Sequence, residues 1–239
     1  TFEAISYVVD LYRGDLRKEA SLLDVSLFLA IFPHLIAGPI LRAAETFPQF
    51  AQLRPLTSER AFSGFRQFVI GLAKKLLLAD TVAGFVDHAF ANAGSLSGTT
   101  LALAVLAYAV QIYGDFSGYS DMGIGVARLL GYDFPENFNF PYLARSPSEF
   151  WRRWHVSLSS WLRDYLYIPL GGNRGGAFRT QVNLMITMLL GGLWHGAAWT
   201  FVLWGGWHGL ALSVQRIVEP ARAAFGRSAP WAGWAATQL

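Results

Sequence analysis

Long apolar stretches alternate along this chain with short segments rich in Pro, Gly, Asn or clustered charge. The apolar stretches cover 22–41, 61–91, 100–131 and 180–215. A straight helix needs about 20 apolar residues to cross the hydrocarbon core of a bilayer. The pattern therefore predicts a set of helices that lie in or on a membrane.

The first stretch, 22–41, carries two prolines within its second half. Pro33 and Pro39 would break or kink a helix, so we expect a short or bent span with irregular backbone at 33–39. Irregular backbone at membrane depth is tolerated only where protein or a cavity covers it. The polar residues 42–60 that follow indicate a loop.

The next two stretches contain charges at positions where a spanning helix would meet lipid. Lys74 and Lys75 lie in the middle of 61–91, which indicates an interfacial helix or two short helices with the lysines reaching toward the membrane surface. Residues 100–131 are the best spanning candidate. Asp115 and Asp121 in its second half would be costly unless they face a protein interior or a wet cavity.

Residues 146–168 show the clearest helix signals, after a predicted loop at 132–145. Ser146 fits the N-cap, Pro147 the first helical position and Glu149 the third, as in a capping box. Aromatic and apolar residues then recur at helical spacing, so we expect one amphipathic helix over 147–168.

The last apolar stretch, 180–215, is rich in glycine, which suits close helix contacts. Its length allows one long span or two short helices. We favour two helices with a break at Gly196–Ala198, because His195 then lies at the break. The tail from Arg216 is polar and contains Pro and Gly.

Composition supports the membrane interpretation. The chain is 53% hydrophobic and 15% charged, whereas about a quarter of an ordinary soluble domain is charged. The absence of cysteine excludes disulfides and cysteine-ligated metals. The net charge of +3 fits basic loops beside a membrane, and no basic segment interleaved with aromatic residues indicates nucleic acid. Because the chain starts at Thr1 without Met, we expect an internal portion of a longer protein.

Five histidines are the main candidates for chemistry. His195 has the most apolar surroundings, and an ionisable group inside a membrane segment indicates function by default. His155 and His208 stand beside tryptophans and are open to structural or functional interpretation, and we take His34 and His88 as structural. No His pair at i,i+4 supports a metal site, and no G-x-S-x-G motif supports a serine hydrolase.

Basic residues gather around the predicted amphipathic helix. For any one of them, simple juxtamembrane charge is sufficient explanation. As a cluster they could hold the phosphates of a nucleotide-bearing donor or of lipid headgroups, and the sequence does not choose between these. The set is Arg152, Arg153, Arg163, Arg174 and Arg179.

Several motifs resemble the membrane-bound O-acyltransferase superfamily. They are DFSGYSDMGIG, ENFNFPYLARSPSEFWRRWHVSLSSWLRDYLYIPLGGNRGG and LGGLWHGAAWTFVLWGGWHG, together with the opening TFEAISYVVDLYRGD and FPHLIAGPILR. The resemblance extends to about Glu219. Within the superfamily, the chain is most similar to the bacterial branch that O-acetylates alginate.

This resemblance implies an all-α polytopic membrane fold, with short, tilted or broken helices around a central funnel or tunnel. Residues 1–239 would form a single catalytic-core region. The family carries an acyl group from a cytoplasmic thioester donor to a hydroxyl across the membrane. For this branch it implies acetyl-CoA as donor and no bound cofactor. It also implies an alginate-like polysaccharide acceptor, a periplasmic acetyltransferase partner and location in the bacterial cytoplasmic (inner) membrane.

The resemblance also places the family's near-invariant histidine on His195 and its second characteristic histidine on His155. We expect His195 to act as general base, His155 to orient the acceptor or bond the carbonyl oxygen, and Trp154 and Trp194 to wall the site. Further substrate-binding candidates are Arg152, Arg153, Asp115 and Asp121, the two aspartates more as structural groups. The alternatives are a transport subunit, or an acyltransferase for another group such as D-alanine or for a peptidoglycan or cellulose acceptor.

Overall fold

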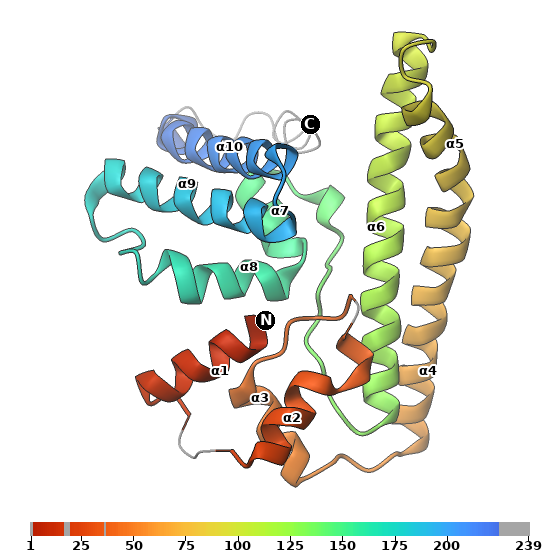
Figure 1. The fold of residues 1–239 in the computed structure, drawn as a ribbon, viewed down its shortest axis with the longest axis vertical. Helices are drawn as coiled ribbons and strands as arrows, with labels where there is room; N and C mark the ends of the chain where they lie inside the picture. Colours follow the sequence, from red (N-terminus) through yellow and green to blue (C-terminus); the bar gives the residue numbers. More distant parts are fainter. Residues whose placement is uncertain (1, 17–19, 36, 225–239) are drawn as a thin grey trace. The chain divides into compact units, whose positions relative to one another are not determined.

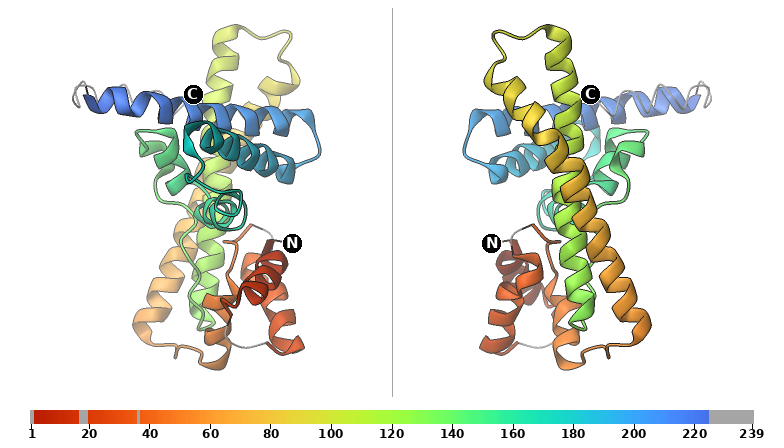
Figure 2. Two further views of the ribbon diagram at one scale, coloured as in Figure 1. Left: turned by 90° about the vertical axis from the view of Figure 1, so that its left-hand side faces the viewer. Right: turned by 90° about the vertical axis from the view of Figure 1, so that its right-hand side faces the viewer.

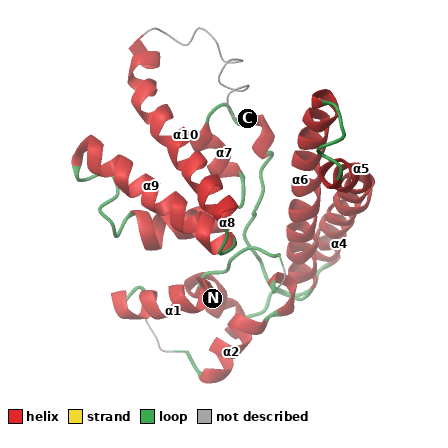
Figure 3. Cartoon of the chain, turned by 45° about the horizontal axis from the view of Figure 1, so that its top comes forward, coloured by secondary structure: helices red, strands yellow, loops and turns green. Residues whose placement is uncertain are grey.

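The computed structural model describes residues 2–16, 20–35 and 37–224, with the helical main chain alone at 220–224. Within these residues all regular secondary structure is helical, which confirms the predicted all-α class (Figure 3). The chain divides into two compact units, Thr1–Asn137 and Phe138–Leu239. The units are described separately below as unit 1 and unit 2.

Unit 1 is built on a long helical hairpin. One arm consists of α4 (Ser58–Ala73), the π-helical segment η2 (Lys74–Ala79) and α5 (Asp80–Ala91), and the other is α6 (Gly98–Leu129). The two arms run side by side along their length (Figures 1 and 2). Among the described residues, α6 alone is long and apolar enough to cross a membrane, as the sequence predicts for 100–131.

Glycines hold the hairpin arms close together. A Cβ added to Gly118 would lie 2.7 Å from the carbonyl oxygen of Gly71, and one added to Gly125 would lie 2.6 Å from that of Gly64. Real Cβ atoms essentially never approach so closely. The backbones therefore meet at two levels seven residues apart, as small residues permit in membrane helix pairs.

The charges inside the hairpin pair with one another. Lys74 Nζ lies 2.6 Å from Asp121 Oδ2, and Lys75 Nζ lies 2.7 Å from carboxylate oxygens of both Asp115 and Asp80. The sequence predicts lysines that reach toward the membrane surface. The structure instead pairs them with carboxylates, mostly on the neighbouring arm, so the two aspartates of α6 are neutralised within unit 1.

The prolines after α2 (Leu22–Ala30) end that helix as predicted. A single 3₁₀ turn, η1 (Phe32–His34), and irregular backbone follow. The Glu3 carboxylate accepts hydrogen bonds from the Leu41 N–H and from His34 Nε2, both at 2.9 Å. The irregular backbone predicted at 33–39 is therefore confirmed for its described residues, in which His34 and Pro39 are buried and Leu35 is 55% exposed.

Helix α1 (Phe2–Arg13) carries its polar side inward. Glu3, Ser6 and Asp10 are buried, while Val8 is 62% and Tyr12 92% exposed. In a soluble protein an amphipathic helix is oriented the other way. The inversion is typical of a helix whose outer side meets lipid or another part of a membrane protein.

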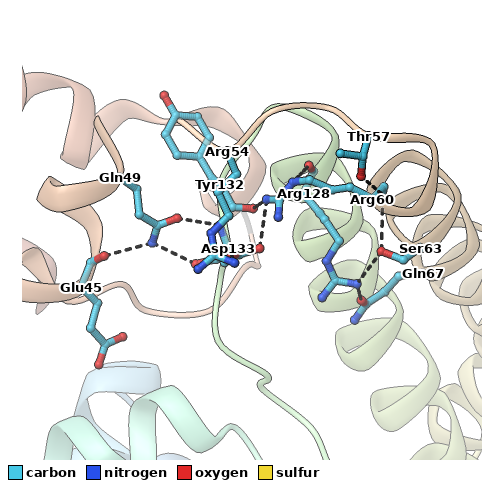
Figure 4. Close-up of polar contacts among 10 residues, drawn as sticks. All are labelled: Glu45, Gln49, Arg54, Thr57, Arg60, Ser63, Gln67, Arg128, Tyr132 and Asp133. Carbon is cyan, nitrogen blue, oxygen red and sulfur yellow. Dashed lines mark hydrogen bonds and ion pairs between the residues drawn. The ribbon is translucent and has the colours of Figure 1, made fainter. Parts of the chain in front are cut away.

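The predicted loop at 42–60 contains a helix that the sequence pattern misses, α3 (Ala43–Ala51). It forms despite Pro48 because its Phe47 ring packs edge-on against Phe28 and Tyr7. A polar network then fixes the end of α6 (Figure 4). Arg60 donates to the carbonyl oxygens of Arg128 and Tyr132, and its guanidinium pairs with Asp133 at 2.9 Å.

Unit 2 begins with a 3₁₀ turn, η3 (Pro141–Leu143), and two short helices, α7 (Pro147–Arg153) and α8 (Val156–Leu162). The π-helical segment η4 (Arg163–Tyr167) and two long helices follow, α9 (Gly176–His195) and α10 (Trp199–Ala224). The long helices lie side by side (Figure 1), with Gly192 of α9 against the backbone of α10. The predicted break between them is confirmed. The polar tail expected from Arg216 is instead the continuation of α10 to Ala224.

Candidate active site

The helix predicted over 147–168 is interrupted at His155, where α7 gives way to α8. The Ser146 hydroxyl accepts the Glu149 N–H at 3.2 Å, as predicted for the N-cap. The Glu149 carboxylate, however, accepts from the Arg145 N–H at 2.9 Å, so the reciprocal half of the capping box does not form as expected. The prediction of one continuous helix is wrong because His155 adopts left-handed backbone angles, with φ of +42°.

Left-handed backbone at a residue other than glycine is strained, typically by about 1–2 kcal/mol. Two residues of the described chain show it, Phe140 and His155, and both lie in unit 2 near the candidate site. Such strain is concentrated at functional sites, where the surrounding structure holds it in place. The sequence offers no specific signal for it, because histidine adopts left-handed backbone more often than most residues but only a small fraction of histidines do so.

The His155 side chain is enclosed, with the residue only 4% exposed. Its imidazole stacks on the Phe138 ring, with centroids 6.4 Å apart and planes at 19°. Burial, and to a smaller extent the nearby His195, lower the pKa of His155 to about 3. His155 is therefore neutral at physiological pH, and it lies close to a histidine forty residues away in sequence.

His195 is the last residue of α9 and does not lie as deep as the sequence suggests. In the part of the chain that the structure describes, its side chain is exposed, because α9 ends there and the chain turns into α10. Its ring contacts three aromatic rings, those of Trp194 at 4.8 Å, Trp204 at 5.1 Å and Phe201 at 6.2 Å between centroids. The expectation of a deeply buried imidazole is thus corrected to an imidazole at a helix end among aromatic rings.

His208 joins the same aromatic cluster from α10. Its ring lies 4.6 Å from Trp204 and 5.1 Å from Trp151, both in edge-to-face geometry, and it stacks near Phe150 at 6.3 Å. Trp204 contacts both His195 and His208. Sequence reasoning did not single out Trp204 or Trp151. The i,i+4 spacing of Trp204 and His208 is the sequence signal from which Trp204 could have been predicted.

The other predicted site residues divide into two groups. Trp154 belongs to the cluster, stacked on Phe150 at 5.6 Å, and Trp194 contacts His195. Arg153 is held by Glu149 at 2.8 Å and by the Asn139 carbonyl oxygen at 3.2 Å, which gives it a structural role.

Three further candidates lie outside the aromatic cluster. Arg152 is exposed and lines a cavity of unit 2. Asp115 and Asp121 belong to unit 1, where lysines neutralise them. The structure therefore does not bring the two aspartates together with the histidines in one unit.

The cluster assembles imidazoles in apolar surroundings, which suits proton transfer. Within the described residues, no group of three His, Asp or Glu side chains is arranged to hold a metal ion. A neutral imidazole accepts a proton from an alcohol at neutral pH, and its reference pKa of about 6.5 is well matched to that task.

Comparison with known sequences identifies the family of this chain. The sequence model of the membrane-bound O-acyltransferase family matches residues 12–235. The chain therefore belongs to this family, and the match extends across both units.

Individual relatives narrow the comparison. The chain is 52% identical to the probable alginate O-acetylase AlgI of Azotobacter vinelandii over 91% of its length, and 54% identical to that of Pseudomonas aeruginosa over 90%. It is 46% identical to the peptidoglycan O-acetyltransferase of Helicobacter pylori over 85% of its length. These alignments cover 43%, 41% and 39% of the respective relatives, so the chain spans about two fifths of their length.

A more distant relative is named for the transfer of a different acyl group. The teichoic acid D-alanyltransferase of Streptococcus thermophilus is 29% identical over 90% of this chain and 55% of its own length.

Proposed function

We propose that this chain is the histidine-bearing part of an O-acetyltransferase of the bacterial cytoplasmic membrane, with helices crossing the bilayer around a tunnel. It would move an acetyl group from a thioester donor, acetyl-CoA, toward hydroxyls of an alginate-like polysaccharide. The observation that carries the proposal is that aromatic contacts within unit 2 connect His155 with His195. The His155 ring stacks on Phe138, and the Trp154 ring contacts both Phe138 and Phe150. His208 stacks on Phe150, and Trp204 contacts both His208 and His195. The names of the relatives that are more than half identical support acetyl transfer and alginate.

In this mechanism His195 takes the proton from the acceptor hydroxyl. The hydroxyl oxygen attacks the thioester carbonyl carbon, the C–S bond breaks, and the leaving thiolate takes the proton back from the imidazolium. His155, neutral because burial lowers its pKa to about 3, would orient the acceptor or bond the carbonyl oxygen. A general base contributes about 10²–10⁴ in rate, so its loss is measurable.

A periplasmic acetyltransferase partner would complete transfer to the polymer.

The exposed aromatic and apolar side chains of unit 2 are consistent with contacts to lipid or to further parts of the protein, since soluble monomers rarely expose large apolar patches. Trp199, for example, is 81% exposed at the start of α10.

The test uses acetyl-CoA with a radioactive acetyl group and membranes that contain the full-length protein together with its periplasmic acetyltransferase partner. It measures the label that reaches the polysaccharide. Wild-type membranes should transfer label, and membranes with His195→Ala should transfer at least about 100-fold less at equal insertion. His88→Ala, a change to an exposed histidine of α5, is the control. Transfer from a D-alanyl thioester but not from acetyl-CoA would contradict the proposed acyl group, and label retained by His195→Ala would contradict the base.

A further inference from the structure

A cavity of about 630 Å³ opens in unit 2 among α7, α9 and α10. Figure 3 shows these three helices next to one another within that unit. The lining residues are Ser148 and Arg152 of α7, Leu184 of α9, and Leu212, Gln215, Arg216 and Glu219 of α10. Sites for cofactors and other small ligands typically have about 300–1,000 Å³, so the cavity has room for a ligand of that size.

The charged residues of this cavity favour an anion. Two guanidinium groups, Arg152 and Arg216, face one carboxylate, Glu219, which leaves one positive charge in excess. In the part of the chain that the structure describes, neither arginine forms an ion pair. Arg152 therefore keeps its donors available, and Arg216 uses part of its guanidinium for a hydrogen bond with the Tyr167 hydroxyl. The guanidinium of Arg153, in contrast, is paired with Glu149.

The polar wall of the cavity is held in place by internal contacts. Gln215 accepts the Ser148 N–H at 2.9 Å and donates to the Ser148 hydroxyl at 2.8 Å, which fixes α10 against the first turn of α7. Arg216 lies beside the Tyr167 hydroxyl, which itself donates to Asn173. A site whose side chains are already held loses less free energy on binding.

Apolar residues also line the cavity, and one face of α10 connects it to the histidine cluster. Leu184 and Leu212 line the cavity. His208, Leu212 and Gln215 follow one another at i, i+4 and i+7, which places them on one side of the helix. At 1.5 Å per residue, Gln215 lies about 10 Å from His208 along the helix axis.

We propose that this cavity binds an amphiphilic ligand that carries a phosphate. The phosphate lies between Arg152 and Arg216, whose planar donor forks match its oxygens, and the apolar part lies on Leu184 and Leu212. Two sources supply this chemistry: the nucleotide end of a thioester donor and the headgroup of an anionic phospholipid. The donor source rests on the proposed function, whereas phosphate binding by itself does not.

The experiment measures binding to the full-length protein in phosphatidylcholine nanodiscs. Adenosine 3′,5′-bisphosphate and acetyl-CoA are the soluble probes, and nanodiscs with a fraction of phosphatidylglycerol report lipid capture. The variants are the doubly substituted Arg152→Gln, Arg216→Gln protein and its Arg→Lys counterpart. Arg174→Gln is the matched control, because Arg174 is exposed in the same unit but does not line the cavity. Thermal melting of each variant reports whether it is folded.

We expect the double glutamine variant to bind at least about tenfold more weakly, because it loses two charge-assisted contacts with the phosphate. The control should bind as tightly as wild type. The lysine variant should recover part of the binding. A loss confined to the bisphosphate and acetyl-CoA assigns the donor, a loss confined to phosphatidylglycerol assigns the lipid, and a loss of both supports the shared chemistry. Unchanged binding of all probes by a folded double glutamine variant would overturn the inference.

Failure of this inference is distinguishable from failure of the proposed function. Wild-type acetyl transfer by His195→Ala would contradict the role of His195 as general base, and it would not affect the conclusion on phosphate binding. Unchanged binding in the arginine variants would remove the phosphate site and leave the role of His195 intact.

Discussion

The two units treat their ionisable side chains in opposite ways. In unit 1 the ionisable side chains inside the fold have polar partners: Lys74 forms an ion pair with Asp121 at 2.6 Å, and Glu3 forms a hydrogen bond with His34 at 2.9 Å. In unit 2 the histidines lie among aromatic rings, and Trp204 contacts two of them. Paired charges hold helices together, whereas neutral imidazoles in apolar surroundings remain able to accept a proton. The contrast assigns structure to unit 1 and chemistry to unit 2.

Among single substitutions at neutral pH, the largest effect on stability should come from breaking a matched pair in unit 1. Lys74→Met leaves the Asp121 carboxylate between α4 and α6 without its cation, and loss of one partner of a buried pair costs about 3–5 kcal/mol. Both side chains are about one fifth exposed, so we expect the lower end, about 3 kcal/mol. Thermal denaturation in detergent measures the loss.

The control is the double substitution Lys74→Met with Asp121→Leu, which removes both charges. It should recover most of the lost stability, because well-packed apolar residues commonly replace a buried pair without loss. If Lys74→Met alone melted at the wild-type temperature, the pair would not hold the hairpin together.

A second prediction concerns pH and applies to unit 2. Burial lowers the pKa of His155 to about 3, below its unfolded value, so the unfolded chain binds a proton that the folded chain does not. Stability contributed by the neutral ring is therefore complete above about pH 6.5 and falls as the pH drops toward 3, by about 1.4 kcal/mol per pH unit. Denaturation measured from pH 7 to pH 4 shows this slope.

His155→Gln should flatten this acid-dependent loss relative to wild type, since glutamine does not titrate. His88→Gln serves as the matched control, because His88 is exposed on α5, and it should leave the slope unchanged. A wild-type slope in His155→Gln would place the responsible group elsewhere.

The third and smallest effect tests the close contact of the hairpin arms. Gly118→Ala puts a Cβ 2.7 Å from the carbonyl oxygen of Gly71, so the arms must separate, at a cost of about 1–3 kcal/mol. Gly84→Ala is the matched control in the same hairpin, with no atom within 4 Å of the added Cβ. It should stabilise the protein by about 0.5–1 kcal/mol, since alanine is the better helix former. Equal melting shifts for both variants would contradict the packing.

These elements also show how far the sequence can be interpreted. The positions of prolines and glycines were sufficient to predict two helix ends, at 33–39 and at Gly196–Ala198, because these residues act locally on the backbone. The helix α3 was missed because Phe47 forms it through contacts with Phe28, a partner distant in sequence. The pairing of Lys74 with Asp121 was missed for the same reason, since 47 residues separate them.

The candidate site was predicted in part. Resemblance to the family indicated His155 and His195, and the structure places both among the aromatic rings of unit 2. The left-handed turn at His155 and the aromatic cluster around Trp204 could not be predicted, because both depend on how separate helices pack. The exposed position of His195 likewise follows from where α9 ends.

The most direct test of the contrast between the units compares one histidine of each. His195→Ala and His34→Ala are assayed in parallel for acetyl transfer per folded molecule and for melting temperature. We expect His195→Ala to have the wild-type melting temperature and to transfer at least about 100-fold less acetyl group. We expect His34→Ala to have a lower melting temperature and unchanged acetyl transfer per folded molecule. Near wild-type transfer by His195→Ala, or loss of transfer by a stably folded His34→Ala, would contradict the assignment of chemistry to unit 2.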